Sequence, residues 1–237
     1  MPNERLYFRQ LLSGRDFARR DMLAQQMVNF VYAVGDRETG ECLLVDPAYA
    51  ADELVSILGE DGMTVVGALA THYHPDHVGG TMRGHTIGGV AELLALAPVK
   101  VHCQQAEAEF VRKVTGISAS DIVAHSPGDT VEVGAIAIQL VHTPGHTPGS
   151  QCFLCDGRLI SGDTLFLDGC GRTDFPGSSP DQMYDSLQRL ARLPEDTVVY
   201  PGHQYHPAPF ASLGAVTASN YVYRPRSKEQ WLAMFGR

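Results

Sequence analysis

Residues 71–80, THYHPDHVGG, are the stretch on which the interpretation of the whole chain depends. Within six positions the stretch carries four side chains that bind divalent metals through nitrogen or oxygen, namely His72, His74, Asp76 and His77. The apolar run 65–70 comes immediately before it and predicts a buried strand. At the end of such a strand the first two ligands, two residues apart, point the same way, and the next two lie in the turn beyond. We therefore predict that one segment serves two metal positions; the alternative is a set of solvated loop histidines.

The composition is that of a folded, acidic chain. Its 237 residues are 44% hydrophobic, which is enough for a substantial core, and we expect a single domain over residues 1–237. The formal net charge is -9, and no run of five basic residues occurs. Both features disfavour DNA or RNA as a partner.

The N-terminal sequence MPNERLYFRQLL has no basic region followed by an apolar core, and no run of 18 apolar residues occurs. We therefore expect a soluble cytoplasmic protein without a membrane partner. The five cysteines are an odd number, which favours reduced thiols over a disulfide framework. Cys152 and Cys155 form a Cys-x-x-Cys pair, but a strand would place them on opposite faces, so we predict no site there.

Strands and helices are predicted to be interspersed in both halves of the chain. The predicted strands are 6–12, 27–34, 42–45, 65–70, 99–102, a hairpin over 130–142 that turns at Gly134, 150–157, 159–162 and 198–200. The predicted helices are 52–58, 90–96, 106–114 with Ala106, Phe110 and Val114 on one face, 181–193 with Met183, Leu187 and Leu190 on one stripe, and 228–235. The strand, helix and strand over 42–70 place the metal motif at the carboxyl end of a strand, where open α/β sheets carry their sites.

Two segments have no clear element. Residues 14–26 contain Arg15, Arg19 and Arg20 and predict either a flap that holds an anionic substrate, or a short helix, or a charged loop that faces water. Residues 83–96 belong to a glycine-punctuated stretch that we interpret as an insertion shaping the wall of the pocket.

Four further polar residues follow predicted strands. His146 is the centre of HTPGHTPGS, a loop that two Thr-Pro-Gly steps restrict, and His203 follows the strand 198–200. Asp163, in SGDTLF, is placed to bridge two cations with its two oxygens, with a buried structural role as the alternative. Asp46 precedes Pro47 at the end of the strand 42–45, where it either orients a metal-bound imidazole from outside or caps a turn.

The complete set, in this order, resembles the metallo-β-lactamase superfamily, with its His-x-His-x-Asp-His motif and its later His, Asp and His. The resemblance implies an α/β fold, an αββα four-layer sandwich with the site at one edge between two sheets. It assigns the ligands to two metals. One metal would be held by His72, His74 and His146, the other by Asp76, His77 and His203, with Asp163 as the bridge.

Within the superfamily, TPGHTPGS, SGDTLF and GCGRTDF are most similar to hydroxyacylglutathione hydrolase (glyoxalase II) and persulfide dioxygenase. This implies a thioesterase that uses a hydroxide bridging two divalent ions, zinc first, then iron or manganese. Asp76 would also orient the hydroxide. Arg172 would contact an anionic thioester substrate or form a structural salt bridge. A homodimer is compatible with the resemblance.

The alternative function implied by the same resemblance is a persulfide dioxygenase with a single Fe(II). Its two-histidine, one-carboxylate set would be His72, His146 and Asp163, which belong to both schemes. A non-catalytic binding protein on this fold is disfavoured because no ligand is missing, and a nuclease is disfavoured by the acidic balance.

Overall fold

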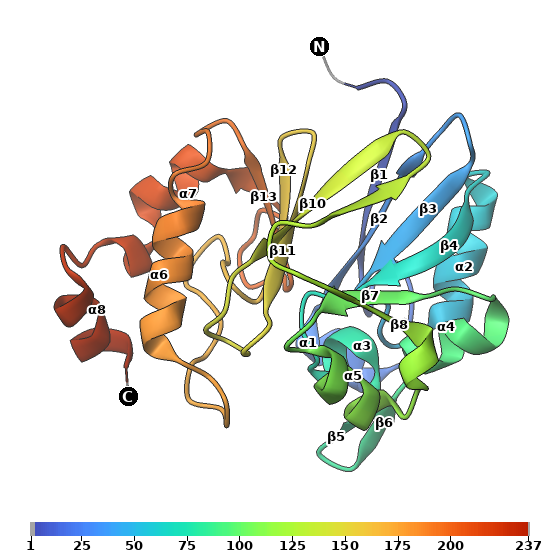
Figure 1. The fold of residues 1–237 in the computed structure, drawn as a ribbon, viewed down its shortest axis with the longest axis horizontal. Coiled ribbons are helices and arrows are strands. Elements are labelled where there is room, and N and C mark those ends of the chain that lie inside the picture. The colour runs from blue at the N-terminus through green and yellow to red at the C-terminus, as the bar shows by residue number, and fades with distance from the viewer. Residues whose placement is uncertain (1–2, 237) are drawn as a thin grey trace.

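Two six-stranded sheets lie face to face, with helices on the outer face of each sheet (Figure 1). The computed structural model describes residues 3–236. The arrangement confirms the αββα sandwich that the motifs imply. Among the described residues, no helix is long and apolar enough to cross a membrane.

The first sheet contains the N-terminal strands and ends in parallel pairing. Its order is β1 (Leu6–Leu12), β2 (Phe30–Asp36), β3 (Glu41–Val45), β4 (Thr64–Leu69), β7 (Val101–Gln104) and β8 (Ile122–His125). The first three strands pair antiparallel, and β3, β4, β7 and β8 pair parallel. The helices packed against it are α2 (Ala51–Glu60), α4 (Val90–Leu96) and α5 (Ala108–Thr115).

The second sheet contains the C-terminal strands. Its order is β14 (Ala211–Ser212), β13 (Val198–Pro201), β12 (Arg158–Gly162), β11 (Gln151–Cys155), β10 (Ile136–His142) and β9 (Thr130–Val133). Only β12 and β13 pair parallel in it. The helices on its outer face are α6 (Pro180–Leu190), α7 (Leu213–Ser219) and α8 (Lys228–Phe235), with 3-10 turns over Ala119–Asp121 and Tyr221–Tyr223 elsewhere.

Alternating side chains of the strands build the core between the sheets. Ile136, Ile138 and Leu140 of β10 point inward and pack in one cluster with residues of the facing sheet such as Val45 and Leu69. Their burial is the main favourable term for joining the sheets. Cys155 belongs to this cluster, whereas Cys152 packs under the outer helices, which confirms that the two thiols face opposite sides of β11.

Two short helices and a two-stranded hairpin occupy stretches for which the pattern predicts no single element. Helix α1 (Met22–Met27) begins after Asp21, whose carboxylate accepts the amide hydrogen of Leu23 at 2.8 Å, so the short-helix alternative holds for this part of 14–26. The predicted strand 27–34 begins too early, because Val28 has a left-handed backbone and β2 starts at Phe30. Helix α3 (Pro75–Val78) and the hairpin of β5 (Gly80–Met82) and β6 (His85–Ile87) follow the metal motif.

The predicted face of the helix 106–114 is wrong. Val111 is the buried residue of α5, whereas Phe110 is 41% exposed and stacks on Tyr73 with ring centroids 4.9 Å apart. Strand β8 and helix α7 were not predicted. Both elements are short, and hydrophobic periodicity in the sequence does not show which layer their apolar residues face.

We expect the neighbouring histidines of β7 and β8 to make the fold sensitive to acid. Nδ1 of His102 lies 2.9 Å from Nε2 of His125, and burial, then the neighbouring imidazole, lowers the pKa of His102 from 6.5 to about 4. Between pH 6.5 and about pH 4 the unfolded chain therefore binds more protons than the folded chain. The contribution of His102 to the free energy of unfolding is lost as the pH falls through this range. Denaturant unfolding over this range should show a smaller loss of stability for His102→Gln than for wild type. The control is His85→Gln, at an exposed histidine. An equal change in the free energy of unfolding with pH for His102→Gln and wild type would contradict this prediction.

Candidate metal centre

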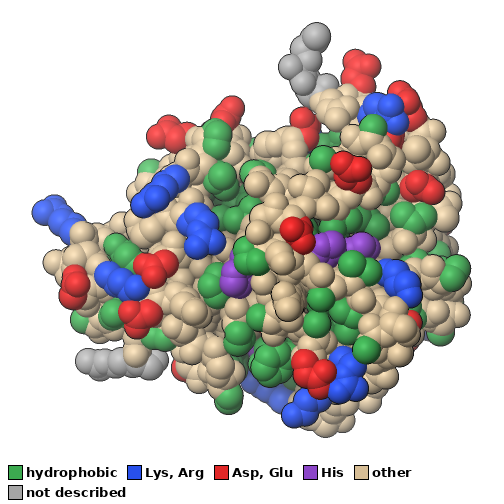
Figure 2. Space-filling model, in the orientation of Figure 1, with side chains coloured by type: hydrophobic (Ala, Val, Ile, Leu, Met, Phe, Trp, Pro, Cys, Tyr) green, Lys and Arg blue, Asp and Glu red, His purple; other side chains and the backbone are tan. Residues whose placement is uncertain are grey.

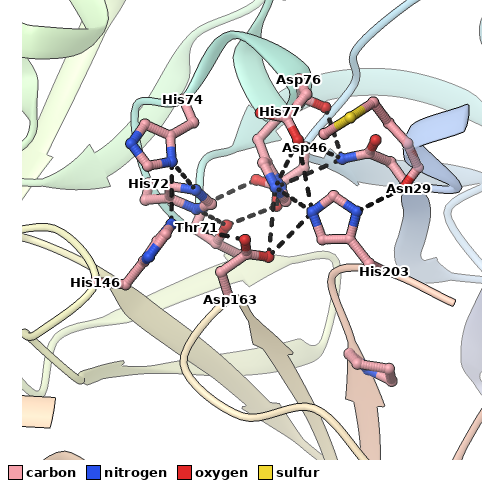
Figure 3. A network of polar contacts seen from close by, with 12 residues as sticks. Asn29, Asp46, Thr71, His72, His74, Asp76, His77, His146, Asp163 and His203 are labelled. Atoms are coloured by element: carbon pink, nitrogen blue, oxygen red, sulfur yellow. Dashed lines mark hydrogen bonds and ion pairs between the residues drawn. The ribbon is translucent and has the colours of Figure 1, made fainter. Parts of the chain in front are cut away.

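Loops and turns that follow strands of both sheets bring the predicted ligands together (Figure 3). The chain after β4 brings His72 and His74, and α3 brings the next two ligands of the motif. The loops after β10, β12 and β13 bring His146, Asp163 and His203. The structure thus brings together all seven side chains predicted as ligands, which are His72, His74, Asp76, His77, His146, Asp163 and His203.

Three imidazoles form the first cluster. Nδ1 of His74 lies 3.0 Å from Nε2 of His72 and 3.0 Å from Nε2 of His146. Burial, together with the other histidines, lowers the pKa of His72, and burial followed by His146 lowers the pKa of His74 to about 4. Both rings are therefore neutral near pH 7, and neutral imidazole is the form that binds metal.

The second cluster combines two imidazoles with a carboxylate. Nε2 of His77 lies 3.2 Å from Nε2 of His203, and Oδ2 of Asp76 lies 3.6 Å and 3.5 Å from these two nitrogens. Burial disfavours a charge on His77, but the carboxylates of Asp76 and Asp163 outweigh it and raise its pKa to about 10. The surrounding field therefore favours positive charge at this position.

Asp163 lies between the two clusters and offers one oxygen to each. Its Oδ2 is 3.6 Å from Nε2 of His146, and its Oδ1 is 3.4 Å from Nε2 of both His77 and His203. Within residues 3–236, Oδ1 is the buried side-chain oxygen or nitrogen that has no hydrogen-bond partner. Burying a carboxylate oxygen without a hydrogen-bond partner is unfavourable unless a cation lies beside it. The donor set therefore fits two divalent ions bound by nitrogen and oxygen.

Asp46 supports the second cluster from outside. It adopts a left-handed backbone, φ 53°, which turns its carboxylate under the metal motif. Its Oδ2 lies 2.9 Å from Nδ1 of His77 and accepts the hydroxyl of Thr71 at 2.6 Å, and Oδ1 accepts the Thr71 amide at 2.8 Å. A carboxylate at Nδ1 leaves Nε2 of His77 facing the cluster.

Sequence reasoning missed the other supports of the second cluster. Nδ2 of Asn29 donates to the carbonyl of Asp76 at 2.9 Å and to its carboxylate at 3.2 Å, and the hydroxyl of Tyr49 donates to Oδ1 of Asn29 at 3.0 Å. Nδ1 of His203 donates to the carbonyl of Met27 at 2.8 Å. The one sequence signal for Asn29 is that it interrupts the apolar run 27–34. The main-chain carbonyl of Met27 and the hydroxyl of Tyr49 leave no signal in the sequence that would reveal these roles.

Arg172 contributes through its main chain. Its carbonyl accepts a hydrogen bond from Nδ1 of His146 at 2.7 Å. Its guanidinium pairs with Asp174 at 2.9 Å and 2.6 Å and lies 4.5 Å from the ring centroid of Phe175, so the salt-bridge alternative describes this structure. Gly171 is needed beside it, because a Cβ there would stand 2.1 Å from the carbonyl of Asp163.

Aromatic rings surround the two clusters. Phe175 stands edge-on to His74, with centroids 5.3 Å apart, and Tyr205 stacks on His203 at 4.8 Å. Phe166 packs edge-on against Tyr205 at 5.1 Å. These rings form apolar walls beside the polar centre.

Comparison with known proteins agrees with this fold and donor set. Residues 26–203 match the family model described as the metallo-beta-lactamase superfamily. The hydroxyacylglutathione hydrolase of Xanthomonas campestris pv. campestris is 40% identical over 85% of this chain and 71% of its own length. The mitochondrial persulfide dioxygenase ETHE1 of Mus musculus is 32% identical over 83% and 72%. The crystal structure of ETHE1 from Myxococcus xanthus superposes with a TM-score of 0.77 at 30% identity, covering 98% of this chain and 90% of that one.

The chain therefore belongs to the metallo-beta-lactamase superfamily. Its histidine and aspartate clusters are of the kind that bind metal in this family, and it is a metal-binding enzyme of the superfamily.

We expect Asp46→Asn to weaken metal binding at the second cluster. Asparagine tolerates the left-handed backbone but removes the charge that orients His77, and loss of such an outer partner costs about 10–100-fold in affinity. The number of metal ions retained per chain after dialysis against a weak chelator, measured by mass spectrometry, should fall towards the number that the first cluster holds alone. Retention equal to wild type would contradict this, and Asp52→Asn, an exposed aspartate on α2, is the control.

Proposed function

We propose that this protein is a thioesterase that uses two divalent ions, most simply zinc, to hydrolyse a small anionic thioester. The observation that carries the proposal is Asp163, which directs one oxygen to each of two complete ligand clusters. The similarity to hydroxyacylglutathione hydrolase supports the reaction class. Histidine nitrogens and carboxylate oxygens suit zinc.

Each metal would be held by its own cluster, and the two metals would share Asp163. When bound, such a pair of ions supplies a hydroxide from water near neutral pH and polarises a carbonyl oxygen. The chain's own residues then have two tasks, which are to orient the attacking water and to position the ester.

Asp76 is the residue we assign to the water. Nδ2 of Asn29 donates to the carbonyl of Asp76 and to Oδ2, the carboxylate oxygen that faces His77 and His203. Held in this way, the carboxylate would accept a hydrogen bond from the attacking water. Tyr49 fixes the amide of Asn29 in turn. A thiolate leaves readily, so no side chain is needed as a general acid at the sulfur.

The walls of the centre support a thioester with an apolar part. The rings of Phe175, Phe166 and Tyr205 would pack against the acyl or thiol chain. Arg172 would contact an anionic group of the substrate if its pairing with Asp174 opens. On the face in Figure 2, acidic and basic side chains are interspersed, and with a net charge of -9 this favours a small molecule over a nucleic acid as the partner.

A second candidate function is a persulfide dioxygenase with one iron. The similarity to ETHE1 favours it, and His72, His146 and Asp163 present a two-histidine, one-carboxylate set near one point. In that scheme the second cluster is not required for the reaction.

Metal content and activity measured on one preparation separate the two functions. Two zinc-like ions per chain together with thioester hydrolysis support the thioesterase. One iron per chain together with oxygen uptake on glutathione persulfide would overturn it.

His77→Ala tests the same question within one chain. It removes a ligand of the second cluster only, so a thioesterase should lose activity by about 100-fold or more, because one of its two ions is lost. Initial rates on a thioester at saturating metal measure this. A variant that keeps most of its thioester hydrolysis would contradict a reaction that needs two metals, and His85→Ala in the β5–β6 hairpin is the matched control.

A further inference from the structure

We propose that Glu107 is the positioning residue of the first metal cluster, because its carboxylate joins the two loops that carry His72, His74 and His146. This inference rests on the proposed metal site, but not on the reaction performed there. Glu107 matches no ligand position and lies at the start of α5.

Three hydrogen bonds reach this carboxylate from two separate loops. Oε2 accepts the amide hydrogen of Tyr73 at 2.8 Å, and Oε1 accepts the hydroxyl of Thr147 and the amide hydrogen of Gly149, each at 2.7 Å. Tyr73 lies between His72 and His74 in the chain, and Thr147 follows His146. One side chain thus ties the main chain beside all three ligands of the cluster.

The carboxylate of Glu107 is enclosed by the protein. The residue is fully buried, and a buried carboxylate is kept only when donors satisfy it. Gly149 packs against it so closely that a Cβ there would stand 2.6 Å from Cγ of Glu107. The main chain of Glu107 is itself fixed, because its amide donates to the carbonyl of Gln104 at 2.8 Å. The carboxylate is therefore a rigid point between the two loops.

The two clusters rest mainly on different supports, although the hydroxyl of Thr71 donates to Asp46 and lies 3.0 Å from Nδ1 of His72. Asp46 holds an imidazole of the second cluster directly, whereas Glu107 holds the backbone that carries the first cluster. Among residues 3–236, the Glu107 carboxylate makes no hydrogen bond to the residues that support the second cluster. A change at Glu107 should therefore affect one metal and spare the other.

Glu107→Gln separates the two ties. The amide oxygen of glutamine can accept from one loop, but its NH2 group then faces the amide hydrogen of the other loop. One loop is released, while size and helix position are kept. Outer supports of this kind are worth about 10–100-fold in metal affinity.

The experiment measures Co²⁺ and Zn²⁺ affinity, by competition with a chromophoric chelator, in two backgrounds of the full chain. His203→Ala leaves the first cluster intact, and His146→Ala leaves the second cluster intact. We expect Glu107→Gln to weaken binding about 10–100-fold in the first background and to leave the second unchanged. The visible absorption of bound Co²⁺ should also change in the first background, because the ligand geometry changes. Unchanged affinity in the first background, or an equal loss in both, would overturn the proposal.

Two further variants keep the test decisive. Glu109→Gln is the matched control, since Glu109 lies on the same helix, is exposed and, among residues 3–236, pairs through its carboxylate with Arg112 alone, at 2.9 Å and 2.6 Å. If Glu107→Gln does not fold, Thr147→Val removes one of the three donors at nearly constant volume and should weaken the first cluster alone. No change in that variant would overturn the proposal. A wild-type chain that binds no divalent ion would overturn both proposals, whereas one that binds metal but hydrolyses no thioester would overturn only the function.

Discussion

The carboxylate of Asp163 is the constraint on which the centre depends. It lies between two groups of imidazoles, and its buried Oδ1 receives no hydrogen bond from the described residues. Burying a carboxylate without a partner costs on the order of several kcal/mol even after the protein relaxes. The surrounding residues are arranged for cations to remove that cost, since imidazole nitrogens and a second carboxylate converge on either side of it.

The fold stabilises this arrangement by supporting both clusters from outside. The second cluster rests on polar side chains and a carbonyl, namely Asp46, Asn29 and Met27. The first rests on main-chain contacts, since the Arg172 carbonyl orients His146 and Glu107 holds the loops. Because each cluster takes ligands from loops of both sheets, the apolar core between the sheets also sets the distances between the ligands within each cluster.

The sequence predicts the ligands better than it predicts their supports. His72, His146 and His203 could be found because each follows an apolar run, and a donor at the end of a buried strand has few other uses. Glu107 and Tyr49 could not be found, because their role depends on which loop lies within hydrogen-bond distance after folding. The same limit explains the wrong face of α5, where Phe110 leaves the core to stack on Tyr73. It also explains the late start of β2, since a left-handed Val28 is rare enough that no pattern predicts it.

Anomalous diffraction from crystals of the metal-loaded protein tests the central claim most directly, which is that Asp163 bridges two occupied clusters. We expect two peaks at the absorption edge of the bound metal, one on each side of the Asp163 carboxylate, with His74 beside one and His77 beside the other. A single peak held by His72, His146 and Asp163, with no density at His77 and His203 at saturating metal, would contradict the dinuclear centre.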